Sequence, residues 1–347
     1  METADRPSSY RPWRRSAVHE VFARGPAARG SPFVVPAPGC WPQGAARHRP
    51  TRKNCYGRPG TMSDPAAPTF ESHSDVLAGS IRLRTTEWSC RDGEARPAVV
   101  ALPGVLAPRS SLAPIGRLLG QHFRFIAVDL PGLGESEKPP PTKYDYSPAR
   151  VAESLTDLMG GLGLARAHIF GHGLGGAAAI HLGARRPELV RTIALASPLG
   201  PEGAFPGLLR LLLAPVVGEL ALGQLMSQRL FSHQYKARIH KDASPEDISA
   251  NFLGVSSPAS RAALLALLRN SVDTRSIIAD CRRLRCPTLL LWGREDRLIP
   301  LTLGRMLARE IPGTGFEILD AGHAPHTEIP EQCAELLRRF FSGERAR

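Results

Sequence analysis

The stretch that most constrains the fold of this 347-residue chain is residues 166–186. An apolar run ends at Phe170, a Gly-rich segment follows over 171–176, and small residues at helical spacing begin directly after it. This order predicts a strand, a sharp turn and a helix. Glycines suit such a turn because they accept strained backbone angles and allow close backbone contact. The chain therefore contains a buried strand that runs straight into a helix.

The same alternation of strands and helices recurs along the chain. We expect strands at 79–88, 97–102, 124–129, 189–196, 288–292 and 316–319, and helices at 110–120, 147–159 and 330–341. Alternating elements of this kind predict an α/β fold with a doubly wound, mostly parallel sheet. Residues 198 to about 275 are helical in pattern, which predicts a helical lid over the carboxyl edge of the sheet.

The first 61 residues differ from the rest in composition. They carry 11 Lys and Arg against 3 Asp and Glu, whereas the remainder carries 33 against 29. Pro, Arg, Gly and Ala dominate without a period of 2 or 3.6, so this segment cannot bury enough apolar surface to order itself. We expect residues 1–61 to be a disordered or non-native extension, with Met62 as the natural start. The folded domain then covers residues 62–342.

Composition also excludes several classes of function. The basic excess belongs to the extension, so a nucleic-acid-binding face on the domain is not expected. No apolar run is long enough to span a bilayer, and no secretory apolar core follows a basic start, so we expect a cytoplasmic protein. Six scattered cysteines and the lack of metal-ligand spacing predict neither a disulfide framework nor a metal site. No cofactor is expected, and the sequence does not fix an oligomeric state.

Four motifs stand in a recognisable order. Residues 129–136 read Asp-Leu-Pro-Gly-Leu-Gly-Glu-Ser, and residues 171–175 read Gly-His-Gly-Leu-Gly. An acidic loop follows at 291–300, and the segment 321–331 contains Gly-His-Ala-Pro. Together they resemble the α/β-hydrolase superfamily, over roughly residues 75–342. The second motif resembles that family's nucleophile elbow, Gly-x-Ser-x-Gly.

The resemblance implies roles for particular residues. Asp296 matches the family's triad carboxylate and His323 its general base. Backbone N–H groups of Val105 and Leu174 match the oxyanion hole, although Pro103 replaces the histidine that is common in that loop.

The two remaining histidines near the motifs are expected outside the chemistry. We expect His172 to pack below the site and His326 to lie on the surface at the start of a helix.

The position of the nucleophile is vacant, because Gly173 has no oxygen, sulfur or carboxylate. A covalent acyl-enzyme at this position is therefore impossible. Three interpretations remain open. His323 and Asp296 can activate water or a substrate proton directly, in hydrolysis, elimination or cyclisation. The protein can instead be an inactive relative that binds a ligand or partner, or a Ser-to-Gly version of an ordinary serine hydrolase. The apolar lid predicts an apolar, carbonyl-containing small molecule as substrate.

Overall fold

The computed structural model describes residues 69–90, 95–200, 213–222 and 227–344. The extension expected at 1–61 lies outside these residues. The described chain forms an eight-stranded sheet in the order β1-β2-β4-β3-β5-β6-β7-β8. The strands are β1 (Thr69–Ala78), β2 (Ile81–Cys90), β3 (Ala98–Leu102), β4 (Arg124–Val128), β5 (Ala167–His172), β6 (Val190–Ala196), β7 (Thr288–Gly293) and β8 (Gly315–Leu319). From β4 to β8 all neighbours are parallel, and β2 is antiparallel to both β1 and β4.

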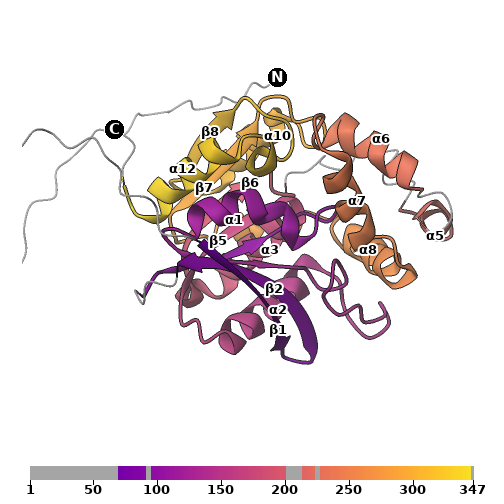
Figure 1. The fold of residues 1–347 in the computed structure, drawn as a ribbon, viewed down its shortest axis with the longest axis horizontal. Helices are drawn as coiled ribbons and strands as arrows, with labels where there is room; N and C mark the ends of the chain where they lie inside the picture. Colours follow the sequence, from indigo (N-terminus) through magenta and orange to yellow (C-terminus); the bar gives the residue numbers. More distant parts are fainter. Residues whose placement is uncertain (1–68, 91–94, 201–212, 223–226, 345–347) are drawn as a thin grey trace, which may run out of the picture. The chain divides into compact units, whose positions relative to one another are not determined.

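Helices cover both faces of this sheet (Figure 1). One face packs against α2, α3, α9 and α10 and the other against α1 and α12, and each face has its own apolar core. The helices outside the β6–β7 connection are α1 (Ala113–Leu119), α2 (Pro148–Gly161), α3 (Gly173–Arg185), α10 (Leu301–Glu310), α11 (Pro325–Glu328) and α12 (Pro330–Phe341), with short 3₁₀ turns η1 (Arg109–Leu112) and η2 (Pro187–Leu189). The predicted doubly wound, mostly parallel sheet is confirmed.

The apolar runs in the sequence correspond to the central strands. Every residue of β3, β5 and β7 is buried. Successive side chains of a strand point to opposite faces, so a strand covered on both faces needs apolar residues at every position. The carboxyl ends of these parallel strands consequently meet along one edge of the sheet, which is where ligands bind in folds of this kind.

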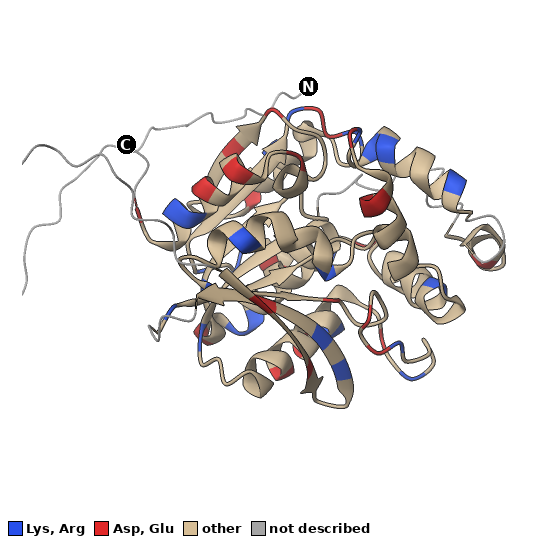
Figure 2. Cartoon of the chain, in the orientation of Figure 1, with Lys and Arg blue, Asp and Glu red and all other residues tan. Residues whose placement is uncertain are grey.

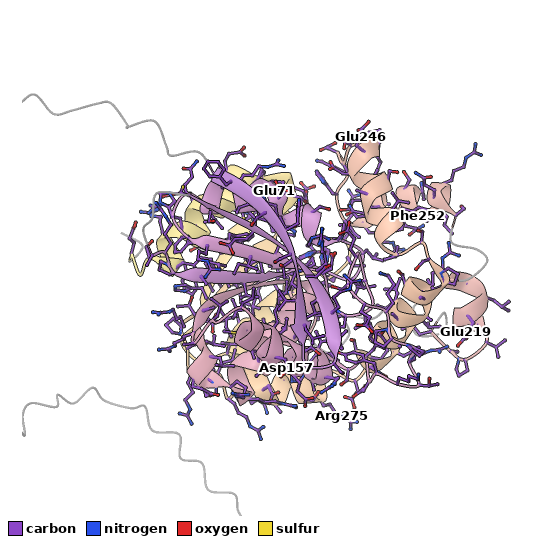
Figure 3. All side chains as sticks on the ribbon, turned by 60° about the horizontal axis from the view of Figure 1, so that its bottom comes forward. Glu71, Asp157, Glu219, Glu246, Phe252 and Arg275 are labelled. Carbon is purple, nitrogen blue, oxygen red and sulfur yellow. The ribbon has the colours of Figure 1, made fainter. Side chains whose placement is uncertain are left out.

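Between β6 and β7, every element in the described residues is helical. These helices are α5 (Val217–Leu220), α6 (Gln228–Arg238), α7 (Pro245–Gly254), α8 (Pro258–Asn270) and α9 (Arg275–Cys281). Figure 3 shows Glu219, Glu246 and Phe252 from α5 and α7 together on one side of the domain, apart from Glu71 and Asp157. The insertion continues past the expected end near residue 275, because α9 runs to Cys281 and packs against α3.

The first hairpin differs from expectation. The strand expected at 79–88 is β2, and it pairs with β1, which the sequence pattern did not predict. Gly79 lies in the turn between them, in the left-handed region, at a φ of 61°.

Among the described residues, no helix combines the length and the apolar composition that a membrane span requires. Lys and Arg are interspersed with Asp and Glu over the described ribbon in Figure 2.

Candidate active site

The site is built around the turn between β5 and α3. β5 ends at His172, and α3 begins at the next residue, Gly173. Gly173 has a φ of 53°, in the left-handed region. That conformation costs other L-residues roughly 1–2 kcal/mol and costs glycine almost nothing. The predicted strand, sharp turn and helix are present, with Gly173 at the bend.

Position 173 has room for a side chain. A Cβ atom built on Gly173 would have Gly104 Cα as its nearest neighbour outside the local chain, at 3.6 Å. This is an ordinary van der Waals distance, so the surrounding side chains and backbone leave space for a Cβ atom at position 173. What position 173 lacks is a reactive atom.

The structure brings Asp296 and His323 together at the carboxyl edge of the sheet. Asp296 follows β7 and His323 follows β8, and His323 Nδ1 lies 2.9 Å from Asp296 Oδ2. The other carboxylate oxygen accepts the backbone N–H groups of Leu298 at 2.9 Å and Ile299 at 2.8 Å. Both members of the pair are buried. The anchored carboxylate accepts from Nδ1–H and orients the ring, so Nε2 is the ring nitrogen left to take up a proton.

Two loops that could supply oxyanion donors also meet here. Leu174 lies in the first turn of α3, where backbone N–H groups have no partner within the helix. Val105 lies in the tight turn after β3, next to Gly104, whose carbonyl accepts the Ala107 N–H at 3.2 Å. Because Gly104 borders position 173, both N–H groups belong to segments in contact at the site.

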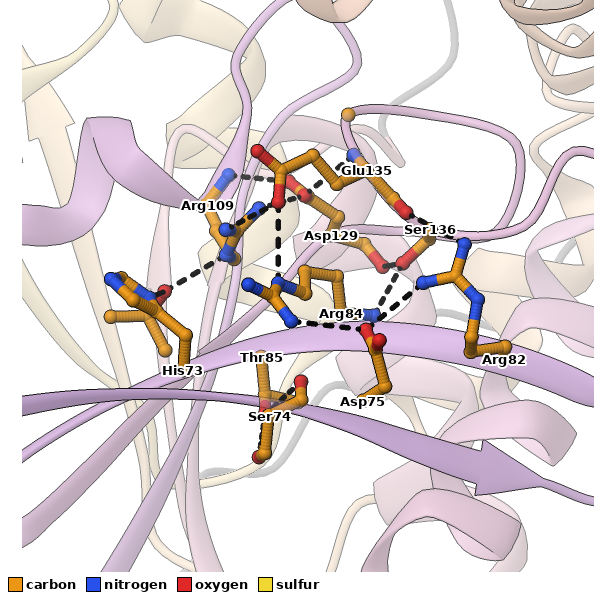
Figure 4. Close-up of polar contacts among 12 residues, drawn as sticks. His73, Ser74, Asp75, Arg82, Arg84, Thr85, Arg109, Asp129, Glu135 and Ser136 are labelled. Atoms are coloured by element: carbon orange, nitrogen blue, oxygen red, sulfur yellow. Dashed lines mark hydrogen bonds and ion pairs between the residues drawn. The ribbon is translucent and has the colours of Figure 1, made fainter.

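A buried ion pair braces the loop that carries Val105 (Figure 4). The Arg109 guanidinium pairs with Asp129, and the Arg109 backbone N–H donates to the same carboxylate at 2.7 Å. Arg109 Nε donates to Thr86 Oγ1 at 2.8 Å, and Nη2 donates to Glu135 at 2.9 Å. Asp129, the first residue of the Asp-x-Pro-Gly motif, therefore anchors the neighbouring loop. The sequence analysis missed Arg109, because its partners Asp129 and Glu135 are distant along the chain.

His326 is not where the sequence predicted it. Instead of lying on the surface it is 1% exposed, because α11 packs its ring against Phe170 and His172. His172 is also buried and packs beside His323, with ring centroids 4.7 Å apart. The prediction that His172 packs below the site agrees with this geometry.

A small apolar cavity separates α6 from the loops of the site. Its volume is 70 Å³, and one wall contains Leu106 from the Val105 loop and Leu298 from the Asp296 loop. The opposite wall belongs to α6 and the residue that follows it, namely Phe231, Gln234, Tyr235, Arg238 and Ile239. The helical insertion therefore reaches the neighbourhood of the site through α6.

A larger hollow of 660 Å³ lies elsewhere, between the loop 141–145 and α8. Its lining includes none of Gly173, Asp296 and His323. This larger hollow is therefore separate from the histidine–aspartate pair and from the turn at Gly173. Within the described ranges, no cluster of three or more His, Cys, Asp or Glu could hold a metal ion.

Comparisons with known proteins agree with this architecture. The family model described as "alpha/beta hydrolase fold" matches residues 97–330. The 2-hydroxymuconate semialdehyde hydrolase of Pseudomonas putida is 30% identical, over 77% of this chain and 93% of its own length. An uncharacterized protein of Mycobacterium tuberculosis is 28% identical, over 77% of this chain and 82% of its own length. The structure of 2-hydroxy-6-oxo-6-phenylhexa-2,4-dienoate hydrolase from Rhodococcus sp. strain RHA1 superposes with a TM-score of 0.67 at 23% identity, covering 79% of this chain and 99% of that one. With its sheet, its strand-end loops and a match over most of its length, this chain belongs to the α/β-hydrolase superfamily.

Proposed function

We propose that this protein is a hydrolase-like enzyme in which His323 and Asp296 act as a general-base pair without a covalent nucleophile. The observation that carries the proposal is the 2.9 Å contact between His323 Nδ1 and Asp296 Oδ2 beside a vacant nucleophile position. A carboxylate held by two backbone N–H groups, with an imidazole on its second oxygen, is the arrangement that a base requires. An enzyme with this pair can act on water or on a substrate proton.

The hydrolytic version of the reaction needs no covalent bond between the substrate and the enzyme. Water attacks the substrate carbonyl carbon as one of its protons moves to His323 Nε2. The carbonyl oxygen takes the electron pair and becomes an oxyanion, which the Val105 and Leu174 N–H groups stabilise. The oxyanion then collapses, and the proton on His323 passes to the leaving group. Each oxyanion donor is worth roughly 3–4 kcal/mol of transition-state stabilisation. The same pair could instead remove a substrate proton in elimination or cyclisation.

The surroundings of the site favour an apolar, carbonyl-containing small molecule. Leu106, Leu298 and Phe231 line the cavity between α6 and the site loops. Apolar walls with a few polar groups are typical of small-molecule sites. The name of the relative in Pseudomonas putida gives a semialdehyde, itself a carbonyl compound, as its substrate. We propose the same broad substrate class for this chain, with the helical insertion as its lid.

A second candidate rests on the space at position 173. A Cβ atom fits there at 3.6 Å from its nearest neighbour, and the backbone keeps the left-handed angle of the bend. This scaffold would accept a serine. The chain could therefore be a Ser-to-Gly version of a serine hydrolase, whose activity one substitution would restore.

One set of assays with p-nitrophenyl butyrate tests both candidates. If His323 is a general base, His323→Gln lowers the wild-type rate about 10²-fold or more. Equal rates for the wild type and His323→Gln would contradict the enzyme proposal and favour a ligand-binding relative.

The second candidate predicts a gain of activity in Gly173→Ser. The matched control is Gly173→Ala, which introduces a Cβ at the same backbone angle but no hydroxyl. Serine at an intact triad contributes several orders of magnitude, so Gly173→Ser should exceed Gly173→Ala by at least ~10²-fold. Equal rates for these two variants would exclude a preserved serine-hydrolase scaffold.

A further inference from the structure

Three imidazole rings lie close together at the candidate site. The His172 ring contacts the other two at an angle, with ring-centroid distances of 4.7 Å to His323 and 4.5 Å to His326 and interplanar angles of 53° and 58°. The three come from different segments: the end of β5, the loop after β8 and the short helix α11. All three are buried, with exposures of 4% for His172 and His323 and 1% for His326.

A hydrogen bond defines the tautomer of the central ring. His172 Nε2 lies 3.1 Å from the backbone carbonyl oxygen of His323. A carbonyl can only accept, so Nε2 carries the proton. Burial lowers the pKa of His172 well below its usual value and that of His326 to about 3, so both rings are neutral near pH 7. His172 Nδ1 is then a bare acceptor, and among the described residues it has no hydrogen-bond partner.

We propose that His172, supported by His326, is a positioning residue for His323. The inference rests on the proposed function, in which His323 is the general base. His172 is covalently next to Gly173 and donates a hydrogen bond to the main chain of His323. This single side chain thereby fixes the distance between the bend that carries the vacant position and the residue that carries the base.

The contact between the rings restricts His323 further. Its Nδ1 is held by Asp296, its carbonyl oxygen accepts from His172, and its ring packs against the tilted His172 ring. With these three constraints, Nε2 keeps one orientation. His326 packs against both His172 and Phe170, so it restricts the movement of the His172 ring. Groups that act on a reacting atom gain from such preorganisation, because a displacement of about 1 Å can cost roughly 10²-fold in rate.

The test is a nuclear magnetic resonance measurement on the full chain with ¹⁵N-labelled histidine. The proposal predicts that His172 is the Nε2–H tautomer and that the Nδ1–H proton of His323 exchanges slowly with water. In His172→Leu, which cannot donate, that proton should exchange about tenfold faster, as expected for the loss of one net hydrogen bond. His172→Gln, whose amide can donate to the same carbonyl, should restore slow exchange.

His326 offers a second, independent comparison. His326→Phe keeps a ring against His172 and should preserve slow exchange, whereas His326→Ala should increase it. If His172→Leu does not fold, this pair decides the question. An Nδ1–H tautomer at His172, or unchanged exchange at His323 in folded His172→Leu and His326→Ala, would overturn the proposal.

These readouts do not depend on turnover. If the His323 Nδ1–H proton exchanges faster in His172→Leu while the wild type and His323→Gln hydrolyse the ester at equal rates, the positioning role is supported and the proposed reaction is rejected. If that proton exchanges at the wild-type rate in His172→Leu while ester hydrolysis depends on His323, the positioning role is rejected and the reaction is supported.

Discussion

Gly173 combines a backbone angle that disfavours side chains with space that would admit one. Its φ is 53°, while a Cβ atom would lie 3.6 Å from Gly104 Cα. We therefore expect Gly173→Ala to lower the free energy of unfolding by about 1–2 kcal/mol, because only the left-handed backbone angle strains the new residue.

The matched control for this prediction is Gly171→Ala, where a Cβ would lie 2.7 Å from the backbone of Gly175 and Gly176. That clash should cost more than the strain at position 173. Urea denaturation of both variants measures the two losses. A smaller loss in Gly171→Ala than in Gly173→Ala would show that the turn is not packed as described.

Asp129 has a structural role at the residue scale. It is 1% exposed and neutralises the Arg109 guanidinium, which is itself buried. Asp129→Asn keeps the shape but leaves the Arg109 guanidinium with the exposed Glu135 carboxylate as its remaining charged partner. Removing the buried partner of such a pair costs about 3–5 kcal/mol. Thermal and urea unfolding should show a large loss. The control is Asp75→Asn, whose exposed ion pairs with Arg82 and Arg84 predict a much smaller effect. Similar losses in both variants would contradict the bracing role of Asp129.

At the scale of elements, a second histidine–aspartate pair joins α3 to α9. His181 Nδ1 lies 2.5 Å from Asp280 Oδ2, and both side chains are almost fully buried. The Asp280 carboxylate also pairs with Arg185 and Arg283 at 3.3 and 3.4 Å. The pair fixes the last helix of the insertion to the helix that begins at Gly173.

We expect Asp280→Asn to loosen α9 before it loosens the rest of the domain. Hydrogen exchange of the backbone amides of α9 (Arg275–Cys281) should increase. Amides of α12 (Pro330–Phe341), on the opposite face of the sheet, are the internal control and should keep their protection. An equal increase in both helices would indicate global destabilisation and contradict a local connection.

The elements that the sequence predicted are those with a strong burial pattern. β3, β5 and β7 are apolar throughout because both faces are covered. The final helix matches its prediction, 330–341, because its apolar residues recur at helical spacing on a buried face. β1 was missed because most of its side chains are exposed and polar, so its pairing with β2 leaves no apolar period.

The candidate site was predictable only where a motif carries it. Asp296 and His323 follow strands within recognisable segments, and the fold brings those segments to one edge. Arg109 has no motif, and its partners Asp129 and Glu135 are 20 and 26 residues away, so its role depends on tertiary structure. The depth of His326 depends likewise on how α11 packs against Phe170, which a short Pro-His segment does not reveal.

At the scale of the whole molecule, buried neutral histidines should limit stability in acid. Burial lowers the pKa of His326 to about 3 and that of His168 to about 4, against a usual value of 6.5. Below pH 6.5 the unfolded chain therefore binds more protons than the native chain, and stability falls as the pH falls. His326 alone should remove about 2 kcal/mol between pH 7 and pH 5.

Urea denaturation at pH 7, 6 and 5 measures this dependence. His326→Phe removes the titrating group and keeps a ring against His172, so the decline with falling pH should become shallower by about that amount. An unchanged decline would show that His326 is not a buried neutral imidazole in solution.

The most direct test of the central claim asks whether the wild type turns over through a covalent intermediate. The wild-type protein is mixed with p-nitrophenyl butyrate, and the reaction is quenched with acid during turnover. The mass of the protein is then measured by mass spectrometry. Gly173→Ser is measured in the same way, because a butyryl adduct on that variant would show that the method detects an acyl-enzyme at this position. We predict a hydrolysis rate that depends on His323 and a mass for the wild type without a butyryl adduct. A butyryl adduct on the wild type, or a rate that is the same in His323→Gln, would contradict direct base catalysis at a vacant nucleophile position.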